Sequence, residues 1–224
     1  MDDTLFTRSK DGKLYEGPLG ENSDNIKLLF VMKEPNGDDL NCFWMKEKVI
    51  TRKEGTKYYN VLGAFAKSFI NVNTHEVALE RSAYINLYPF DGKSEAIPNS
   101  ETGKSYIDLI NDVNVWKNVR KLDVAEPIFK GCTKKQILCN RLKIIKDALE
   151  NNISVVVHFE IADMIVNCSI LSNCFEKKDI KKEKYHISSF RYKDKKSKLY
   201  AIPHPASMLK YSELEKILNT TIYP

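Results

Sequence analysis

The sequence lacks the features that mark several large classes of protein. No apolar run approaches the roughly 20 residues of a membrane-spanning helix, and the start, Met1-Asp2-Asp3, has no signal-peptide layout. No internal repeat or interdomain linker divides the chain. We therefore expect a cytoplasmic monomer without a membrane partner, folded as one domain over residues 1–224 with an irregular lead-in at 1–25.

Cysteine is sparse, and its spacing gives no metal motif. The five cysteines form no Cys-x-x-Cys pair, which argues against a zinc knuckle or a redox motif, and their odd number argues against a disulfide framework. His75, His158 and His186 show no ligand spacing, and no glycine-rich phosphate loop is present. We expect neither a metal nor a cofactor, and we expect most of the cysteines to be small buried hydrophobic residues.

Strong net charge is also absent, but the modest charge of +5 is unevenly spread. From Glu176 to Lys198, ten Lys and Arg residues face four Asp and Glu residues. Such a run is typical of a solvated face or a flexible hairpin. The ring-bearing residues between these charges are Tyr185, His186, Phe190 and Tyr192. They favour nucleic-acid binding, because cations contact phosphates and rings offer stacking faces.

Apolar runs of strand length alternate with segments of helical periodicity. The predicted strands are 27–32, 81–87, 153–159 and 199–202. The predicted helices are 56–70, 105–111, 133–149, 161–168 and 212–218. Near-continuous apolar strands alternating with helices indicate a parallel sheet covered on both faces. The predicted fold class is α/β, a three-layer α/β/α sandwich with a central, roughly four-stranded parallel sheet.

Three of the predicted strands end in polar residues suited to catalysis or binding. Glu34 precedes Pro35 after the first strand, Asn86 lies within the second, and His204 stands between two prolines after the last. In an open α/β sheet, ligands bind beyond the carboxyl ends of the strands, so these side chains are candidates for one pocket. A surface carboxylate, a loop-capping amide and a surface histidine are the ordinary alternatives.

The order and character of these motifs resemble the uracil-DNA glycosylase superfamily over about residues 28–218. The segment Glu34-Pro35 is similar to its first motif, Asn86-Leu87-Tyr88-Pro89 to the second motif of the single-strand-selective branch, and His204-Pro205 to the third. Met32-Lys33 departs from the glycine-led start of the first motif, and the cysteine spacing does not fit the iron-sulfur branches. Asn36 replaces a tyrosine of the uracil-specific branch, which puts strict uracil selectivity in doubt.

The resemblance implies a role for each motif. As catalytic residues, Glu34 would orient or deprotonate a water and His204 would donate to a carbonyl oxygen of the leaving base. Asn86 would read the polar edge of a base flipped out of the DNA, and Asn36 would leave room for a 5-substituent.

The resemblance also implies contacts that hold the flipped nucleotide and its DNA. Phe43, or else Trp44, would stack on the base, although core packing is as ordinary a role for either. Ser207, Leu209 and Lys210 would contact DNA, and the wedge that fills the vacated stack would come from Met208, Leu209 and Tyr211. A hydrophobic staple for the final helix is the alternative role of that wedge.

The resemblance thus predicts a monofunctional DNA glycosylase that leaves an abasic site in single- or double-stranded DNA. Its substrate would be a uracil-like base, as in repair, or a 5-modified pyrimidine such as a hypermodified cytosine of phage DNA, as in antiphage defence. A non-catalytic DNA-binding module on the same fold is the main alternative. A small-molecule hydrolase or nucleotide-binding protein is a third class, which lacks the support of a phosphate loop.

Overall fold

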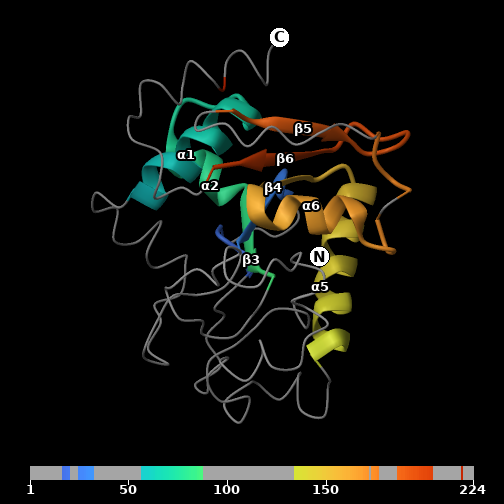
Figure 1. Ribbon diagram of the computed structural model, residues 1–224. Helices are drawn as coiled ribbons and strands as arrows, with labels where there is room; N and C mark the ends of the chain where they lie inside the picture. The colour runs from blue at the N-terminus through green and yellow to red at the C-terminus, as the bar shows by residue number, and fades with distance from the viewer. Residues whose placement is uncertain are drawn as a thin grey trace.

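The computed structural model describes residues 17–20, 25–32, 57–87, 134–171, 173–176, 186–203 and 218. Within these residues the chain forms an α/β fold of six strands and four helices (Figure 1). The strands are β1 (Gly17–Pro18), β2 (Leu28–Met32), β3 (Ser82–Asn86), β4 (Ser154–His158), β5 (Ser188–Arg191) and β6 (Lys198–Ile202). The helices are α1 (Lys57–Ile70), α2 (His75–Glu80), α5 (Lys134–Glu150) and α6 (Phe159–Asn167).

The strands form one mixed sheet in the order β1-β3-β2-β4-β6-β5. The pairs β2–β3, β2–β4 and β4–β6 are parallel, whereas β1 and β5 pair antiparallel with β3 and β6 at the two edges. The α/β class is as predicted, but the sheet is a mixed one of six strands and not a parallel one of about four. The sequence did not indicate the two edge strands, because β1 has only two residues, inside the expected lead-in, and β5 lies in the charged segment.

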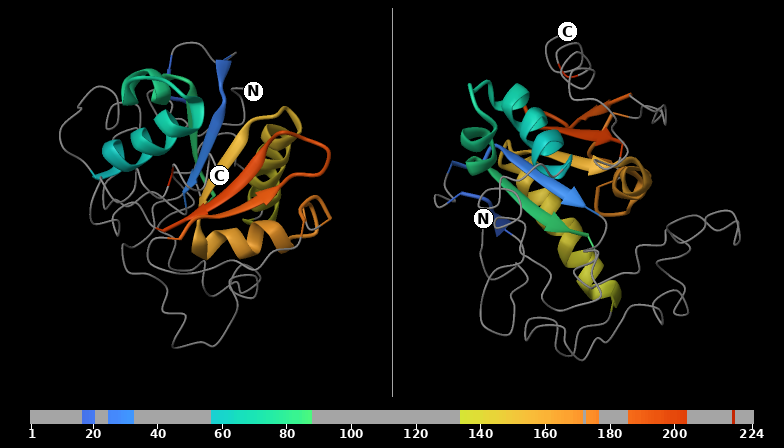
Figure 2. Two further views of the ribbon diagram at one scale, coloured as in Figure 1. Left: turned by 90° about the horizontal axis from the view of Figure 1, so that it is seen from above. Right: turned by 90° about the vertical axis from the view of Figure 1, so that its left-hand side faces the viewer.

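The pleat of the strands divides the apolar core between the two faces of the sheet. Alternate residues of each parallel strand point to opposite sides. In β2, Leu28, Phe30 and Met32 pack on the side of α1 and α2. Leu29 and Val31 pack on the side of α5 and α6. The sheet therefore lies between two pairs of helices, as Figure 2 shows.

Helix α1 packs on the sheet through the apolar stripe predicted from its sequence. Val61, Leu62 and Phe65 are buried on this face. Phe65 and Phe69 meet the ring of Tyr200 in β6 edge-on, with centroid distances of 5.4 and 5.7 Å. Edge-to-face ring pairs stabilise beyond their area burial, by about 0.5–1.5 kcal/mol each, so these contacts fix α1 against β6.

Helix α2 was not predicted, because six residues are too few for a readable helical period. The hydroxyl of Thr74 caps it by accepting the Val77 backbone N–H at 3.3 Å. Ala78 and Leu79 are buried against the sheet. The helix leads directly into β3 and so helps to set where that strand begins.

Helix α5 ends at the residues that the sequence indicates. The side chain of Asn151 donates to the carbonyl oxygen of Asp147 at 2.8 Å, and Asn152 takes a left-handed conformation with φ of 59°. The backbone N–H of Ile153 then donates to the carbonyl oxygen of Ala148 at 2.9 Å. An asparagine in the left-handed conformation is a common helix stop, and it turns the chain into β4 here.

Several sequence predictions fall wholly or partly outside the described residues. The helix at 105–111 lies outside them, and of the final helix only Leu218 is described, helical and buried.

Cys139, Cys168 and Cys174 are free thiols and only half-buried, so the expectation of buried cysteines does not hold fully for these three. Burial raises the pKa of the Cys168 thiol. No helix in the described ranges has both the length and the apolar character to cross a membrane.

The contact between α1 and α2 gives a test of the packing. A Cβ added at Gly63 would lie 2.7 Å from the Cβ of His75. The His75 ring meets the Tyr59 ring edge-on, with centroids 5.8 Å apart. Glycine to alanine within a helix normally stabilises by about 0.5–1 kcal/mol. Because overpacking costs about 1–3 kcal/mol, we expect Gly63→Ala to lower the free energy of unfolding in urea. The control Asn60→Ala, at an exposed position of α1, should change it by less than about 0.5 kcal/mol. A stabilised Gly63→Ala protein would contradict this packing.

Candidate functional site

The carboxyl ends of the four mutually parallel strands lie in register at one edge of the sheet. Met32 of β2 pairs with Asn86 of β3, and His158 of β4 pairs with Ile202 of β6. Val31 pairs with Val157, so the same register continued by one residue places His158 beside Met32. We call Asn86, Met32, His158 and Ile202, in this order across the sheet, the strand-end row.

The side chains of the strand-end row all stand on the α1–α2 face of the sheet. Met32 and Ile202 belong to the apolar cluster on that face. Asn86 and His158 follow two residues after Tyr84 and Val156, which also belong to it, so the pleat sends them to the same side. With Met32 between them, Asn86 and His158 are two strand spacings apart, or about 10 Å.

The chain connections make this edge a topological switch point. From β2 the chain passes through α1 and α2 to β3 on one side, and from β4 it passes through α6 and β5 to β6 on the other. Crevices open beyond the carboxyl ends of strands where successive connections diverge in this way. The ends of β2 and β4, at Met32 and His158, are therefore the place where the topology favours a ligand.

Asn86 is the one predicted site residue that the structure describes. Its side chain is 5% exposed, and its Oδ1 accepts a hydrogen bond from the Tyr84 hydroxyl at 3.1 Å. Residues two apart in a strand share a face, so Tyr84 is placed to hold the carboxamide in one orientation. The carboxamide of Asn86 is therefore a buried, oriented polar group at the strand-end row.

His158 is the residue of this edge that sequence reasoning missed. It is half-buried, and its ring lies near that of Phe159, with centroids 6.5 Å apart. The sequence indicates no role for His158 as a metal ligand, since no second histidine lies at a suitable interval. The sequence feature that could have indicated a site role is its position near the end of the predicted strand 153–159. An imidazole is a side chain that can take part in acid–base chemistry.

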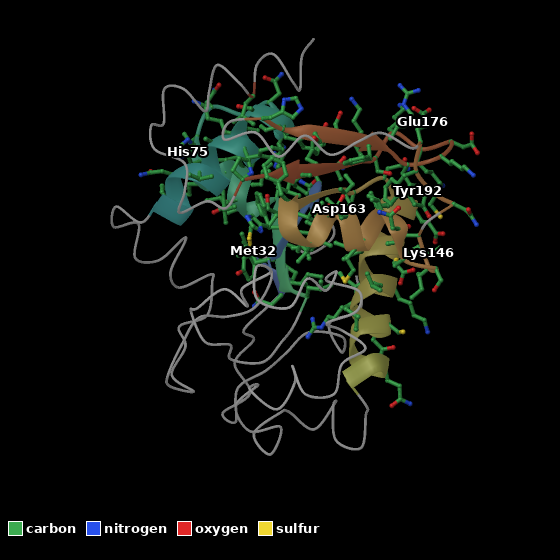
Figure 3. All side chains as sticks on the ribbon, viewed as in Figure 1. Met32, His75, Lys146, Asp163, Glu176 and Tyr192 are labelled. Atoms are coloured by element: carbon green, nitrogen blue, oxygen red, sulfur yellow. The ribbon has the colours of Figure 1, made fainter. Side chains whose placement is uncertain are left out.

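The other predicted site residues lie outside the described residues. They are Glu34, Asn36, Phe43, His204, Ser207, Leu209 and Lys210. In the sequence, Glu34 follows Met32 by two residues and His204 follows Ile202 by two residues. The described strands therefore lead into the first and third motifs from the strand-end row. Figure 3 labels Met32 at this edge, on the side of the molecule away from Glu176 and Tyr192.

Metal chemistry finds no support in the described ranges, where no group of three His, Cys, Asp or Glu side chains is arranged to hold a metal ion. What the described edge offers is a buried amide and a half-buried imidazole, separated by Met32. Comparisons with family models, with curated proteins and with solved structures each return no match.

The hydrogen bond between Tyr84 and Asn86 can be measured as a coupling energy. We expect Tyr84→Phe to lower the free energy of unfolding by about 1 kcal/mol, because it removes the donor to a buried acceptor. Urea denaturation of Tyr84→Phe, Asn86→Ala and the double variant should give a coupling of about 0.5 kcal/mol or more. Strict additivity of the two substitutions would show that the pair does not interact.

Proposed function

We propose that this protein is a DNA glycosylase that hydrolyses the N-glycosidic bond of a flipped-out uracil-like or 5-modified pyrimidine. One observation supports the proposal most. The strands that lead into the three motifs are β2, β3 and β6. Strand β2 pairs in parallel with β3, and β4 joins β2 to β6 in parallel, so the carboxyl ends of all three lie in one row. The motifs that resemble the uracil-DNA glycosylase superfamily therefore start from one edge of one sheet, at its switch point.

The proposed reaction displaces the base with water. The water oxygen forms a bond to C1′ of the sugar as the bond from C1′ to the base nitrogen breaks with its electron pair. Glu34 accepts the proton of the water and offsets the positive charge that develops on the sugar. His204 donates to a carbonyl oxygen of the departing anionic base, which is then protonated by solvent. The products are a free base and an abasic site.

Base recognition in this proposal falls to Asn86. The Tyr84 hydroxyl engages its oxygen, so the amide is oriented before a base arrives. An amide held in one orientation gains selectivity, because it matches the polar edge of one base better than that of another. Phe43 would stack on the base, and Asn36, with Gly37 after it, would admit a group at the 5-position. These assignments favour a 5-modified pyrimidine slightly over uracil.

The test is an abasic-site assay on labelled single- and double-stranded DNA. The substrates carry uracil, 5-hydroxymethylcytosine, glucosylated 5-hydroxymethylcytosine or no modification. We expect alkali-sensitive cleavage of a modified substrate, and we expect Glu34→Gln to lower the rate by about a hundredfold or more with DNA binding retained. The matched control is Glu80→Gln, at an exposed position of α2, which should cleave like the unaltered protein.

Two outcomes would contradict the proposal. If the unaltered protein binds these DNAs and forms no abasic sites, the non-catalytic DNA-binding module replaces the enzyme. If Glu34→Gln cleaves at the full rate, the first motif does not activate water and the assignment of roles fails.

His158 gives a second test of the same site. Because it lies in the row that leads to the first and third motifs, we expect His158→Gln to lower kcat by about tenfold or more. An unchanged kcat in a folded variant would place His158 outside the chemistry.

A further inference from the structure

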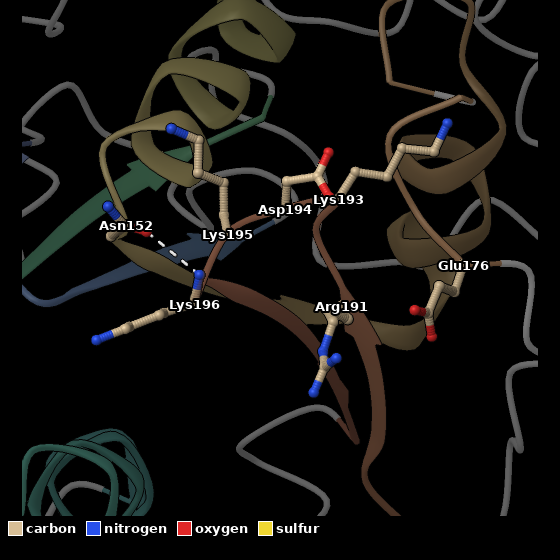
Figure 4. A pocket seen from close by; sticks show the side chains of 7 residues that line it. All are labelled: Asn152, Glu176, Arg191, Lys193, Asp194, Lys195 and Lys196. Carbon is tan, nitrogen blue, oxygen red and sulfur yellow. Dashed lines mark hydrogen bonds between the residues drawn. The ribbon is translucent and has the colours of Figure 1, made fainter.

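A second polar feature lies at the turn between β5 and β6, where an open cavity of about 750 Å³ is lined almost entirely by charged side chains (Figure 4). Its lining residues are Asn152, Glu176, Arg191, Lys193, Asp194, Lys195 and Lys196. We call this cavity the basic pocket. It falls within the cation-rich segment that the sequence singles out, and the proposed reaction does not use it.

The basic pocket is held in place by hydrogen bonds to the junction of α5 and β4. The Lys196 backbone N–H donates to Oδ1 of Asn152 at 3.2 Å, drawn as the dashed line in Figure 4. The Ser197 hydroxyl donates to the carbonyl oxygen of Leu149 at 2.6 Å. On the other side of the turn, the Lys193 backbone N–H donates to the carbonyl oxygen of Cys174 at 2.8 Å. The cationic turn is thus fixed to the sheet and to helix α5.

Two aromatic residues of this segment, Phe190 and Tyr192, do not serve as stacking faces. Phe190 and Tyr192 are buried, and both meet Phe175 edge-on, with centroid distances of 6.5 and 5.6 Å. Burial, with a hydrogen bond to Cys174, raises the pKa of the Tyr192 hydroxyl, which stays neutral at physiological pH. The expectation of base stacking at Phe190 and Tyr192 is therefore wrong. These rings pack the hairpin onto the core, and the described residues that line the basic pocket offer electrostatic recognition.

Arg191 alternates with the buried Phe190 in β5 and faces outward, and the lysines at 193, 195 and 196 follow in the turn. Arg191, Lys193, Lys195 and Lys196 are all exposed, against the two carboxylates of Glu176 and Asp194, which leaves a net charge of +2 on the lining. In the part of the chain that the structure describes, none of the four cations has an ion-pair partner. Anionic groups of a ligand can therefore bind them without breaking an existing pair.

The basic pocket is separate from the strand-end row. It lies where β4 and β6 begin, beside Asn152 and Lys196, whereas the row lies where these strands end. A strand of five residues is about 15 Å long, so the two features lie at opposite ends of β4 and β6. A group bound in the basic pocket does not contact a base held at the row.

We propose that the basic pocket binds phosphate groups of a nucleic-acid backbone and forms a second, sequence-independent anchor for the protein. Several fixed cations around an open cavity suit successive phosphates, and the lack of exposed rings among Phe190 and Tyr192 predicts indifference to base identity. The phosphate chemistry rests on charge and geometry alone. The choice of DNA as the nucleic acid rests on the proposed function.

The test is fluorescence-anisotropy titration of unmodified DNA at several salt concentrations. Lys195→Gln/Lys196→Gln is compared with the charge-matched control Lys67→Gln/Lys143→Gln, whose positions lie on α1 and α5 away from the pocket. We expect the pocket variant to bind on the order of tenfold more weakly at 0.1 M salt, with a salt slope smaller by about two. The control should retain the affinity and slope of the unaltered protein.

The outcomes separate this inference from the proposed reaction. Equal affinity and slope for the pocket variant and the unaltered protein would overturn the inference, as would a protein that binds no DNA. If the pocket variant loses affinity while no substrate is cleaved, the anchor stands and the glycosylase reaction fails. Competition by inorganic phosphate at constant ionic strength, as strong as that by DNA, would show a site for a small anion and overturn the backbone anchor.

Discussion

The pairing of β2 with β3 on one side and with β4 on the other is the constraint on which the rest of the structure depends. It places β2 inside the sheet, where helices cover both faces, and all five of its residues are buried. With β2 central, the first crossover must run to one side and the later one to the other, which creates the switch point. The register of these pairs then fixes which side chains share the carboxyl edge, so Asn86 and His158 stand on the same face.

Two edges of the same sheet carry different chemistry as a result. The carboxyl edge has a buried amide, a half-buried imidazole and apolar neighbours, an environment suited to reading one group of a ligand. The N-terminal ends of β4 and β6 lie beside exposed cations on a fixed turn, an environment suited to binding anionic groups without recognising their shape. Neutral recognition at one edge and electrostatic anchoring at the other fit a protein that acts on one nucleotide of a long polyanion.

The elements that the sequence predicted best are those with the clearest apolar pattern. Strand β2 and helix α5 have continuous or strictly periodic apolar patterns, so their type followed from the residues alone. Strand β5 was missed because Arg191 and its charged neighbours face solvent while Phe190 alternates inward, a half-buried edge pattern hidden in a charge run. Helix α2 and strand β1 were missed because each is too short to show a period.

The candidate site was predictable only in part, for a similar reason. Asn86 stood out because an amide inside an apolar strand needs a partner, and the Tyr84 hydroxyl supplies one. His158 did not stand out, since its importance comes from cross-strand register, which a single strand's sequence does not encode. The burial of Phe190 and Tyr192 likewise depends on which face of the hairpin packs inward. The surrounding charges hid the alternation of buried and exposed residues that would have indicated this.

The proposed reaction can be tested by detecting the released base by mass spectrometry after single-turnover incubation with DNA that carries each candidate pyrimidine. We expect an intact free base from one modified substrate, formed in equal amount to the abasic sites in the same sample. Bound DNA from which no base of any kind is released would contradict it, and would reassign the carboxyl edge of the sheet to binding alone.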